Sequence, residues 1–133
     1  MRDTASILVV DDNPSMAKTL ADIMNAKGFE VHAAYSGLEA LAILQSQPVD
    51  ILLTDVAMPD MNGVELYRAT RKIFPKLTTI LMTAYAADDI IHQGLAEGIK
   101  TVLTKPLDID FMLTLFLAYK RLIVEEPDYD PFR

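Results

Sequence analysis

The sequence predicts an α/β protein whose central sheet is parallel and covered by helices on both faces. Two observations lead to this fold class. Short apolar runs rich in β-branched residues alternate five times with helical segments along the 133 residues, and parallel strands need such crossovers between them. With 51% hydrophobic and 23% charged residues, the chain can also bury a single core.

The strands are predicted from their apolar runs. The first run is apolar along nearly its whole length, which indicates a strand buried on both faces. The second run predicts a weaker strand. The five expected strands cover residues 6–10, 30–34, 49–54, 78–83 and 101–104.

Helix-end signals locate the segments between the strands. Pro14 suits the first turn of a helix, where its missing N–H costs nothing, and Gly28 ends that helix. Ser36 and Glu39 have the spacing of a capping box. The expected helices run from Pro14 towards Gly28, from Ser36 to about Gln47, between Gly63 and Phe74, from about Ala87 to Glu97, and from Asp108 to about Val124.

One domain is expected over residues 1–124. Residues 125–133 are acidic and contain prolines, so they are expected to form a tail or the start of a linker. There are no internal repeats.

Composition excludes several function classes. The net charge of −7 argues against direct nucleic-acid binding, which depends on Lys and Arg at phosphates. No apolar run is long enough for a membrane span. The chain has no cysteine, so it has neither disulfides nor thiolate chemistry. We expect a protein of the reducing cytoplasm.

Polar side chains lie at the carboxyl ends of four of the predicted strands. Asp11 and Asp12 follow the first strand, Asp55 the third and Lys105 the fifth, while Thr83 ends the fourth. Each of these features alone is common in turns and loops. Because ligands of open α/β sheets bind at the carboxyl ends of the strands, their coincidence there predicts a functional site.

The chemistry of these groups suits phosphoryl transfer. Clustered carboxylates repel one another and resist ionisation unless a cation compensates them. Mg²⁺, which prefers a few carboxylates together with waters and phosphate oxygens, is the expected ion. An ammonium and a hydroxyl can then hold phosphoryl oxygens, which is most of what this reaction needs from a protein.

In these residues the chain resembles the receiver family of response regulators. The matching segments are residues 7–13, 50–55, 58–63, 80–84 and 103–107. The resemblance extends over the domain to residue 124 and implies a flavodoxin-like fold with sheet order 2-1-3-4-5. It also implies phosphorylation by a histidine kinase or a histidine phosphotransfer protein.

The resemblance implies a role for each residue of the site. Asp55 would be the phosphoacceptor. Asp12 would bind Mg²⁺ directly, Asp11 mostly through water, and the backbone carbonyl of Ala57 would be the third protein ligand. Lys105 would hold a phosphoryl oxygen.

The resemblance also implies a switch. Thr83 would move towards the phosphoryl group, and the Lys105–Pro106 peptide is often cis in this family. An aromatic residue usually stands three positions before the lysine and moves with the threonine, but here that position is Val102. The switch would therefore depend on Thr83 and the loops, or be smaller than usual. Tyr85 could take over part of the aromatic role, and its ring is expected to shield the acyl phosphate; the alternative is a plain surface residue.

The last predicted helix is apolar over more than one face. Its expected buried stripe is Phe111, Met112, Leu115, Phe116, Tyr119, Leu122 and Ile123. Leu113, Leu117 and Val124 widen it, which indicates a second surface to bury. We therefore expect the fourth helix, the fifth strand and this helix to bind an output domain, a partner or a second copy. Alternatively, Tyr129 or Phe132 of the tail covers the helix.

Three other functions are possible for a chain of this fold class. A pseudo-receiver would keep the fold and bind partners without phosphate. An aspartyl-phosphate phosphatase needs a second Asp two residues after the nucleophile, where this chain has Ala57. A flavin-binding domain needs a phosphate-cradling first loop, but Asp11 and Asp12 make this loop acidic. The sequence therefore favours a signalling domain over an enzyme.

Overall fold

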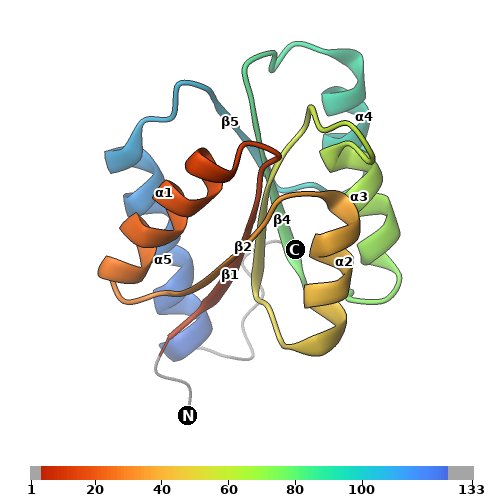
Figure 1. The fold of residues 1–133 in the computed structure, drawn as a ribbon. Helices are drawn as coiled ribbons and strands as arrows, with labels where there is room; N and C mark the ends of the chain where they lie inside the picture. The colour runs from red at the N-terminus through yellow and green to blue at the C-terminus, as the bar shows by residue number, and fades with distance from the viewer. Residues whose placement is uncertain (1–3, 126–133) are drawn as a thin grey trace.

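The computed structural model describes residues 4–125 and contains a five-stranded sheet whose neighbouring strands are all parallel (Figure 1). The strands are β1 (Ser6–Val10), β2 (Glu30–Ala34), β3 (Ile51–Asp55), β4 (Thr78–Thr83) and β5 (Thr101–Thr104). Their order is β2-β1-β3-β4-β5. The predicted fold class and strand order are confirmed.

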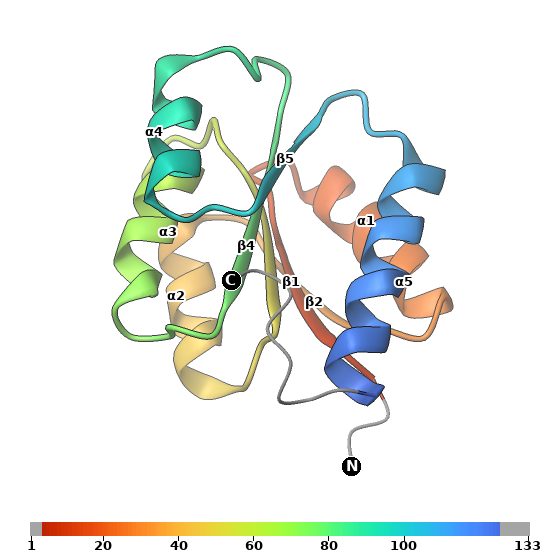
Figure 2. The ribbon, with the colours of Figure 1, turned by 180° about the vertical axis from the view of Figure 1, so that it is seen from behind.

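Helices cover both faces of the sheet. They are α1 (Pro14–Ala26), α2 (Gly37–Ser46), α3 (Gly63–Arg71), α4 (Asp89–Glu97) and α5 (Ile109–Glu125). Helices α1 and α5 lie on one face, and α2, α3 and α4 lie on the other (Figures 1 and 2). No helix among the described residues is both long and apolar enough to cross a bilayer.

Strands β1 and β3, which are neighbours in the interior of the sheet, are buried on both faces. Ile7 and Val9 of β1 belong to the core cluster that contains residues of α1 and α5, whereas Leu8 and Val10 belong to the cluster under α2 and α3. Every residue of β1 and β3 is buried. Close packing on both sides holds these strands rigidly, so the residues that follow them have well-defined positions.

Several predicted boundaries were wrong by a few residues. The third strand and the fourth helix each begin two residues later than predicted. The third helix ends at Arg71, before the predicted Phe74, and the chain then forms turns in which the amides of Ile73 and Phe74 donate to the carbonyl of Thr70.

The predicted buried stripe of α5 is confirmed at its centre, but the prediction is wrong at the first residue of the stripe. Met112 and Phe116 are fully buried against the sheet, as predicted. Phe111 was predicted to be buried, but 57% of it is exposed. One residue is a rotation of about 100° around a helix, so Phe111 points away from the face on which Met112 is buried.

The predicted tail lies almost entirely outside the described residues. Helix α5 ends at Glu125, and residues 126–133, including Tyr129 and Phe132, are not described. The idea that these two side chains cover the last helix stays a prediction, as does the domain boundary after residue 124.

Candidate functional site

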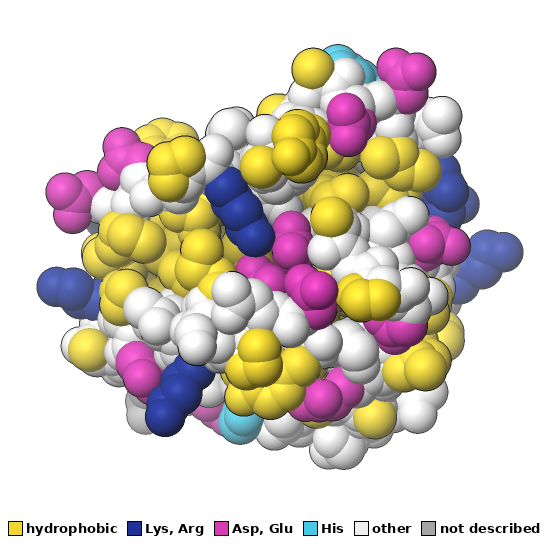
Figure 3. Space-filling model, turned by 45° about the horizontal axis from the view of Figure 1, so that its top comes forward, with side chains coloured by type: hydrophobic (Ala, Val, Ile, Leu, Met, Phe, Trp, Pro, Cys, Tyr) yellow, Lys and Arg dark blue, Asp and Glu magenta, His cyan; other side chains and the backbone are white. Residues whose placement is uncertain are grey.

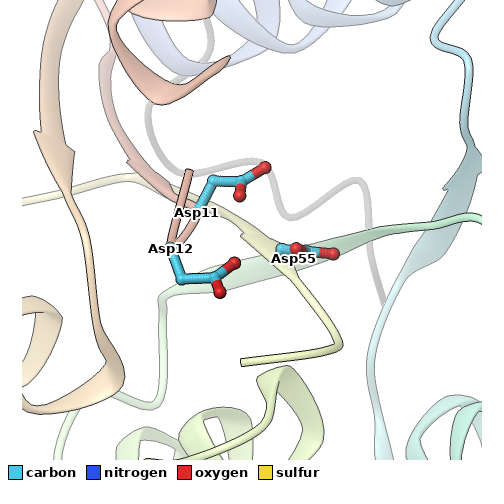
Figure 4. Close-up of side chains that lie close together, drawn as sticks. All are labelled: Asp11, Asp12 and Asp55. Carbon is cyan, nitrogen blue, oxygen red and sulfur yellow. The ribbon is translucent and has the colours of Figure 1, made fainter. Parts of the chain in front are cut away.

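Three aspartates meet at the carboxyl ends of two neighbouring strands. Strands β1 and β3 pair in register up to Val10 and Thr54, so Asp11 and Asp55 are the next residues on adjacent strands. Figure 4 shows the side chains of Asp11, Asp12 and Asp55 projecting into one region. Their carboxylate oxygens lie within 4.8 Å of one another. The strand order thus brings together residues that are 43 or 44 positions apart in the sequence.

The three carboxylates differ in exposure. Asp11 and Asp55 are buried and Asp12 is exposed. Burial raises the pKa of the Asp55 carboxyl, the charge of Asp11 raises it further, and Lys105 opposes both effects without cancelling them. The site therefore holds more negative charge than its surroundings stabilise. Oxygen donors with uncompensated negative charge match the preference of Mg²⁺.

Lys105 is the counter-ion of the cluster. Its Nζ lies 3.1 Å from Oδ2 of Asp11 and 3.4 Å from Oδ2 of Asp55. Burial alone would lower the pKa of the Lys105 ammonium, but the two carboxylates outweigh it and raise that pKa. The other oxygen of Asp11 accepts a hydrogen bond from the backbone N–H of Asn13, 3.0 Å away. Figure 3, a view onto this end of the molecule, shows acidic side chains gathered at the centre beside a basic one.

Thr83 ends β4 beside the start of the Lys105 segment. It pairs with Thr104 of β5, and its carbonyl accepts a hydrogen bond from the N–H of Lys105 at 2.7 Å. The Thr83 hydroxyl accepts a hydrogen bond from the N–H of Tyr85 at 3.0 Å. The Lys105–Pro106 peptide is cis, as the resemblance suggested.

A short loop after Asp55 forms one wall of the site. Ala57 is exposed in this loop, which is closed by a hydrogen bond from the N–H of Gly63 to the carbonyl of Val56 at 2.9 Å. A Cβ on Gly63 would lie 2.5 Å from the carbonyl oxygen of Asp55. Only glycine therefore lets α3 begin this close to β3.

Gly63 is a site residue that the sequence analysis missed. The stretch that ends at Gly63 was interpreted as a turn and as one of the segments of the family resemblance, and no role was expected for Gly63 itself. Asn62 and Glu65 form a capping box in the structure, each side chain bonding to the other's backbone N–H. The spacing of Asn62 and Glu65 is visible in the sequence and could have located the start of α3.

The resemblance implied a part in the switch for Tyr85 and Val102, and these two residues lie in different environments. Tyr85 is 68% exposed, in the loop between β4 and α4. Val102 is partly buried and packs, together with Ile90, against a cluster that includes Leu81 and Ile91. Val102 thus contributes to the core between β5 and α4.

Comparison with known sequences points to one family. A family model described as response regulator receiver domain matches residues 7–116. A response regulator receiver protein of Anaeromyxobacter sp. is 42% identical over 108 residues, covering 81% of this chain and 45% of that protein. Transcriptional regulatory protein GlrR of Escherichia coli is 33% identical over 106 residues, covering 80% of this chain and 24% of that protein. This chain therefore spans less than half of either relative.

A further sequence relative and two solved structures are also similar to this chain. Sporulation initiation phosphotransferase F of Bacillus subtilis is 35% identical over 104 residues, covering 78% of this chain and 84% of that protein. Chemotaxis protein CheY4 of Vibrio cholerae has a TM-score of 0.80 with 29% identity, covering 86% of this chain and 97% of that chain. Response regulator TrrA of Thermotoga maritima, solved in complex with Mg²⁺-BeF, has a TM-score of 0.74 with 28% identity and the same coverage.

Proposed function

The chain belongs to the response regulator receiver family and is a receiver domain of two-component or phosphorelay signalling, and from this premise we propose that Asp55 accepts a phosphoryl group from a phosphohistidine. One observation carries the proposal. The carboxylate oxygens of Asp11, Asp12 and Asp55 lie within 4.8 Å of one another, and the Lys105 ammonium contacts two of these residues.

Mg²⁺ is the proposed cofactor. Asp12 and Asp55 would bind it directly, Asp11 mostly through water, and the backbone carbonyl of Ala57 would be a further ligand. The support is the set of oxygen donors, the raised pKa of Asp55 and the Mg²⁺-BeF complex of the Thermotoga maritima regulator. When bound, the ion neutralises negative charge on the phosphoryl oxygens.

The reaction is a direct displacement at phosphorus. A carboxylate oxygen of Asp55 forms the new O–P bond, and the N–P bond of the donor breaks. Its electron pair returns to the imidazole nitrogen, which is protonated from solvent. Lys105 moves from Asp11 to a phosphoryl oxygen, and the Thr83 hydroxyl donates to another. If the Thr83 side chain turns towards the phosphoryl group, the hydrogen bond that its hydroxyl accepts from the Tyr85 N–H at rest breaks, and this change couples phosphorylation to the loop between β4 and α4.

The test is binding of the phosphoryl mimic beryllofluoride, followed by amide NMR with and without Mg²⁺. We expect Mg²⁺-dependent shifts at Asp55, Thr83 and Lys105 that vanish in Asp55→Asn. Asp22→Asn, which removes an exposed carboxylate of α1, should behave as wild type. No Mg²⁺-dependent shift in the wild type would refute the proposal and favour a phosphate-independent pseudo-receiver.

We further propose that α4, β5 and α5 form the surface for an output domain, a partner protein or a second copy. Leu95 of α4 and Phe111 and Leu117 of α5 are exposed apolar side chains on these helices. Sedimentation with and without beryllofluoride tests the homodimer. A monomer at every concentration in both states would leave only a different protein as the partner. Phosphodonor and partner are expected in the cytoplasm.

A further inference from the structure

The loop between β3 and α3, residues 56–62, is tied at Val56 both to the sheet and to the start of α3. The N–H of Val56 donates to the carbonyl of Met82 in β4 at 3.2 Å, and the carbonyl of Val56 accepts from the N–H of Gly63. Between these points Ala57 and Asp60 are exposed. Met58 is buried in the core cluster under α2 and α3 and holds the middle of the loop. Asp60 lies on the exposed outer side of the loop, where further support has to come from a neighbouring element.

That support comes from the first turn of α2. The backbone N–H of Leu38 donates to Oδ2 of Asp60 at 3.3 Å, across 22 residues of sequence. Burial tends to raise the pKa of the Asp60 carboxyl, but hydrogen bonds from backbone N–H groups, including those of Leu38 and Gly37, lower it overall. The amino end of a helix carries unpaired N–H groups and partial positive charge, so it favours a carboxylate there.

A second contact joins the same two segments. A Cβ on Gly37 would lie 2.8 Å from Cβ and 2.9 Å from Sδ of Met61. The absence of a side chain at Gly37 therefore lets Met61 rest against the first residue of α2. Because one of the two atoms is the Met61 Cβ, which cannot move without the backbone, a larger residue at position 37 would displace the loop itself.

We propose that Asp60 is a positioning residue of the metal site, which holds the β3–α3 loop against the amino end of α2 so that the Ala57 carbonyl is available to Mg²⁺. This inference rests on the proposed function, since it assumes the carbonyl ligand. The positioning role differs from the roles in the proposed function, because Asp60 would contact neither the ion nor the phosphoryl group.

The proposal has a reciprocal consequence. If the Asp60 contact favours the metal-binding shape of the loop, then Mg²⁺ must favour the Asp60 contact by the same factor. Binding of Mg²⁺ should therefore slow hydrogen exchange of the Leu38 amide, although Leu38 belongs to α2 and is 64% exposed. Loss of partners that orient metal ligands typically weakens metal binding by roughly 10- to 100-fold. Because the ligand here is a backbone carbonyl on an exposed loop, we expect a loss of Mg²⁺ affinity near the lower end of this range.

The experiment compares the Mg²⁺ dissociation constants of the wild type and three variants by amide NMR titration. Asp60→Ala removes both the charge and the hydrogen-bond acceptor, whereas Asp60→Asn removes only the charge. We expect Asp60→Ala to bind Mg²⁺ roughly 10-fold more weakly, Asp60→Asn to stay within about 2-fold of wild type, and the Leu38 protection by Mg²⁺ to vanish only in Asp60→Ala. Gly37→Ala displaces the loop without changing charge and should also weaken Mg²⁺ binding.

The outcomes separate the two proposals. Equal weakening in Asp60→Ala and Asp60→Asn would mean that only long-range charge matters, and it would overturn the positioning role. Unchanged Mg²⁺ affinity in Asp60→Ala would overturn it as well. In both of these cases the wild type still binds Mg²⁺ and the proposed function stands. A wild type that binds no Mg²⁺ would overturn both.

Discussion

Gly63 controls how closely α3 approaches Asp55, the proposed phosphoacceptor, and the substitution Gly63→Ala tests this role. In the present structure an added Cβ would lie 2.5 Å from the Asp55 carbonyl oxygen and 3.2 Å from its carbonyl carbon, whereas ordinary contacts begin at 3.4 Å. The backbone of α3 or of Asp55 must therefore move by about 0.9 Å, the difference between 3.4 Å and 2.5 Å. Both are backbone segments, so no side chain can rotate to relieve the overlap.

The expected losses follow from this displacement. Overpacking of this kind costs about 1–3 kcal/mol, which for a domain of this size corresponds to a fall in melting temperature of roughly 3–12 °C. A misplacement of about 1 Å in a reacting group can reduce a rate by roughly 100-fold. We expect phosphorylation of Gly63→Ala to be 10- to 100-fold slower than wild type at saturating Mg²⁺.

The assay is the rate of phosphorylation by phosphoramidate, which has the same N–P bond as phosphohistidine, followed by intact-protein mass. Gly94→Ala in α4 is the matched control. Its added Cβ would meet Cδ1 of Ile99 at 2.6 Å and Cγ2 of Val64 at 3.3 Å. Both atoms end side chains rather than belonging to the backbone, and alanine is the better helix former. Gly94→Ala should keep the wild-type rate. A folded Gly63→Ala with an unchanged rate would refute the reasoning, and so would an equal loss in the control.

Four further predictions test other parts of the molecule. In EDTA, Asp55→Asn should raise the melting temperature at pH 7, because the folded state raises the pKa of Asp55 and so disfavours its charged form. This gain should disappear as the pH falls from the raised pKa of the folded state to the pKa of the unfolded state. A gain in melting temperature that persists at low pH would contradict this cause. Phe116→Ala should lower the free energy of unfolding in urea by about 3–5 kcal/mol, because Phe116 is fully buried and packs edge-on against two aromatic rings; a loss below about 1 kcal/mol would mean that the core closes over the cavity. Glu97→Ala should speed amide exchange in α4, because Glu97 accepts hydrogen bonds from Arg68 and Arg71 of α3, and exchange unchanged from wild type would show that these ion pairs do not restrain the helix. Tyr85→Ala should shorten the lifetime of the phosphorylated state, as followed by the decay of phosphoprotein mass; an unchanged lifetime would mean that the exposed Tyr85 ring does not shield the phosphate.

The fold class could be predicted because its signals are local. A strand buried on both faces needs a continuous apolar run, and residues 6–10 show one. The helix caps at Asn13 and Ser36 are equally local, and their side chains accept the first-turn N–H groups in the structure. Such patterns involve residues a few positions apart, so neighbouring residues are enough to reveal them.

Helix ends and surface positions were less predictable because they depend on what a residue packs against. Phe111 has the same apolar character as Met112, and only its direction on the first turn of α5 leaves it exposed. Pro75 disfavours the helical conformation at Phe74, but no residue type in that stretch marks the earlier end of α3 at Arg71. Such features depend on the packing around a helix end, which neighbouring residues in the sequence do not reveal.

For this protein, the sequence by itself determined the fold class, the strand order that its family resemblance implied, and the residues gathered at the carboxyl end of the sheet. Only the tertiary structure decided that Lys105 lies nearer Asp11 than Asp55, that Gly63 borders the Asp55 backbone, and that Asp60 bonds to α2. The physical reason is distance along the chain. A strand or a cap is specified by neighbouring residues, whereas a contact between loops depends on how several packed elements are placed together.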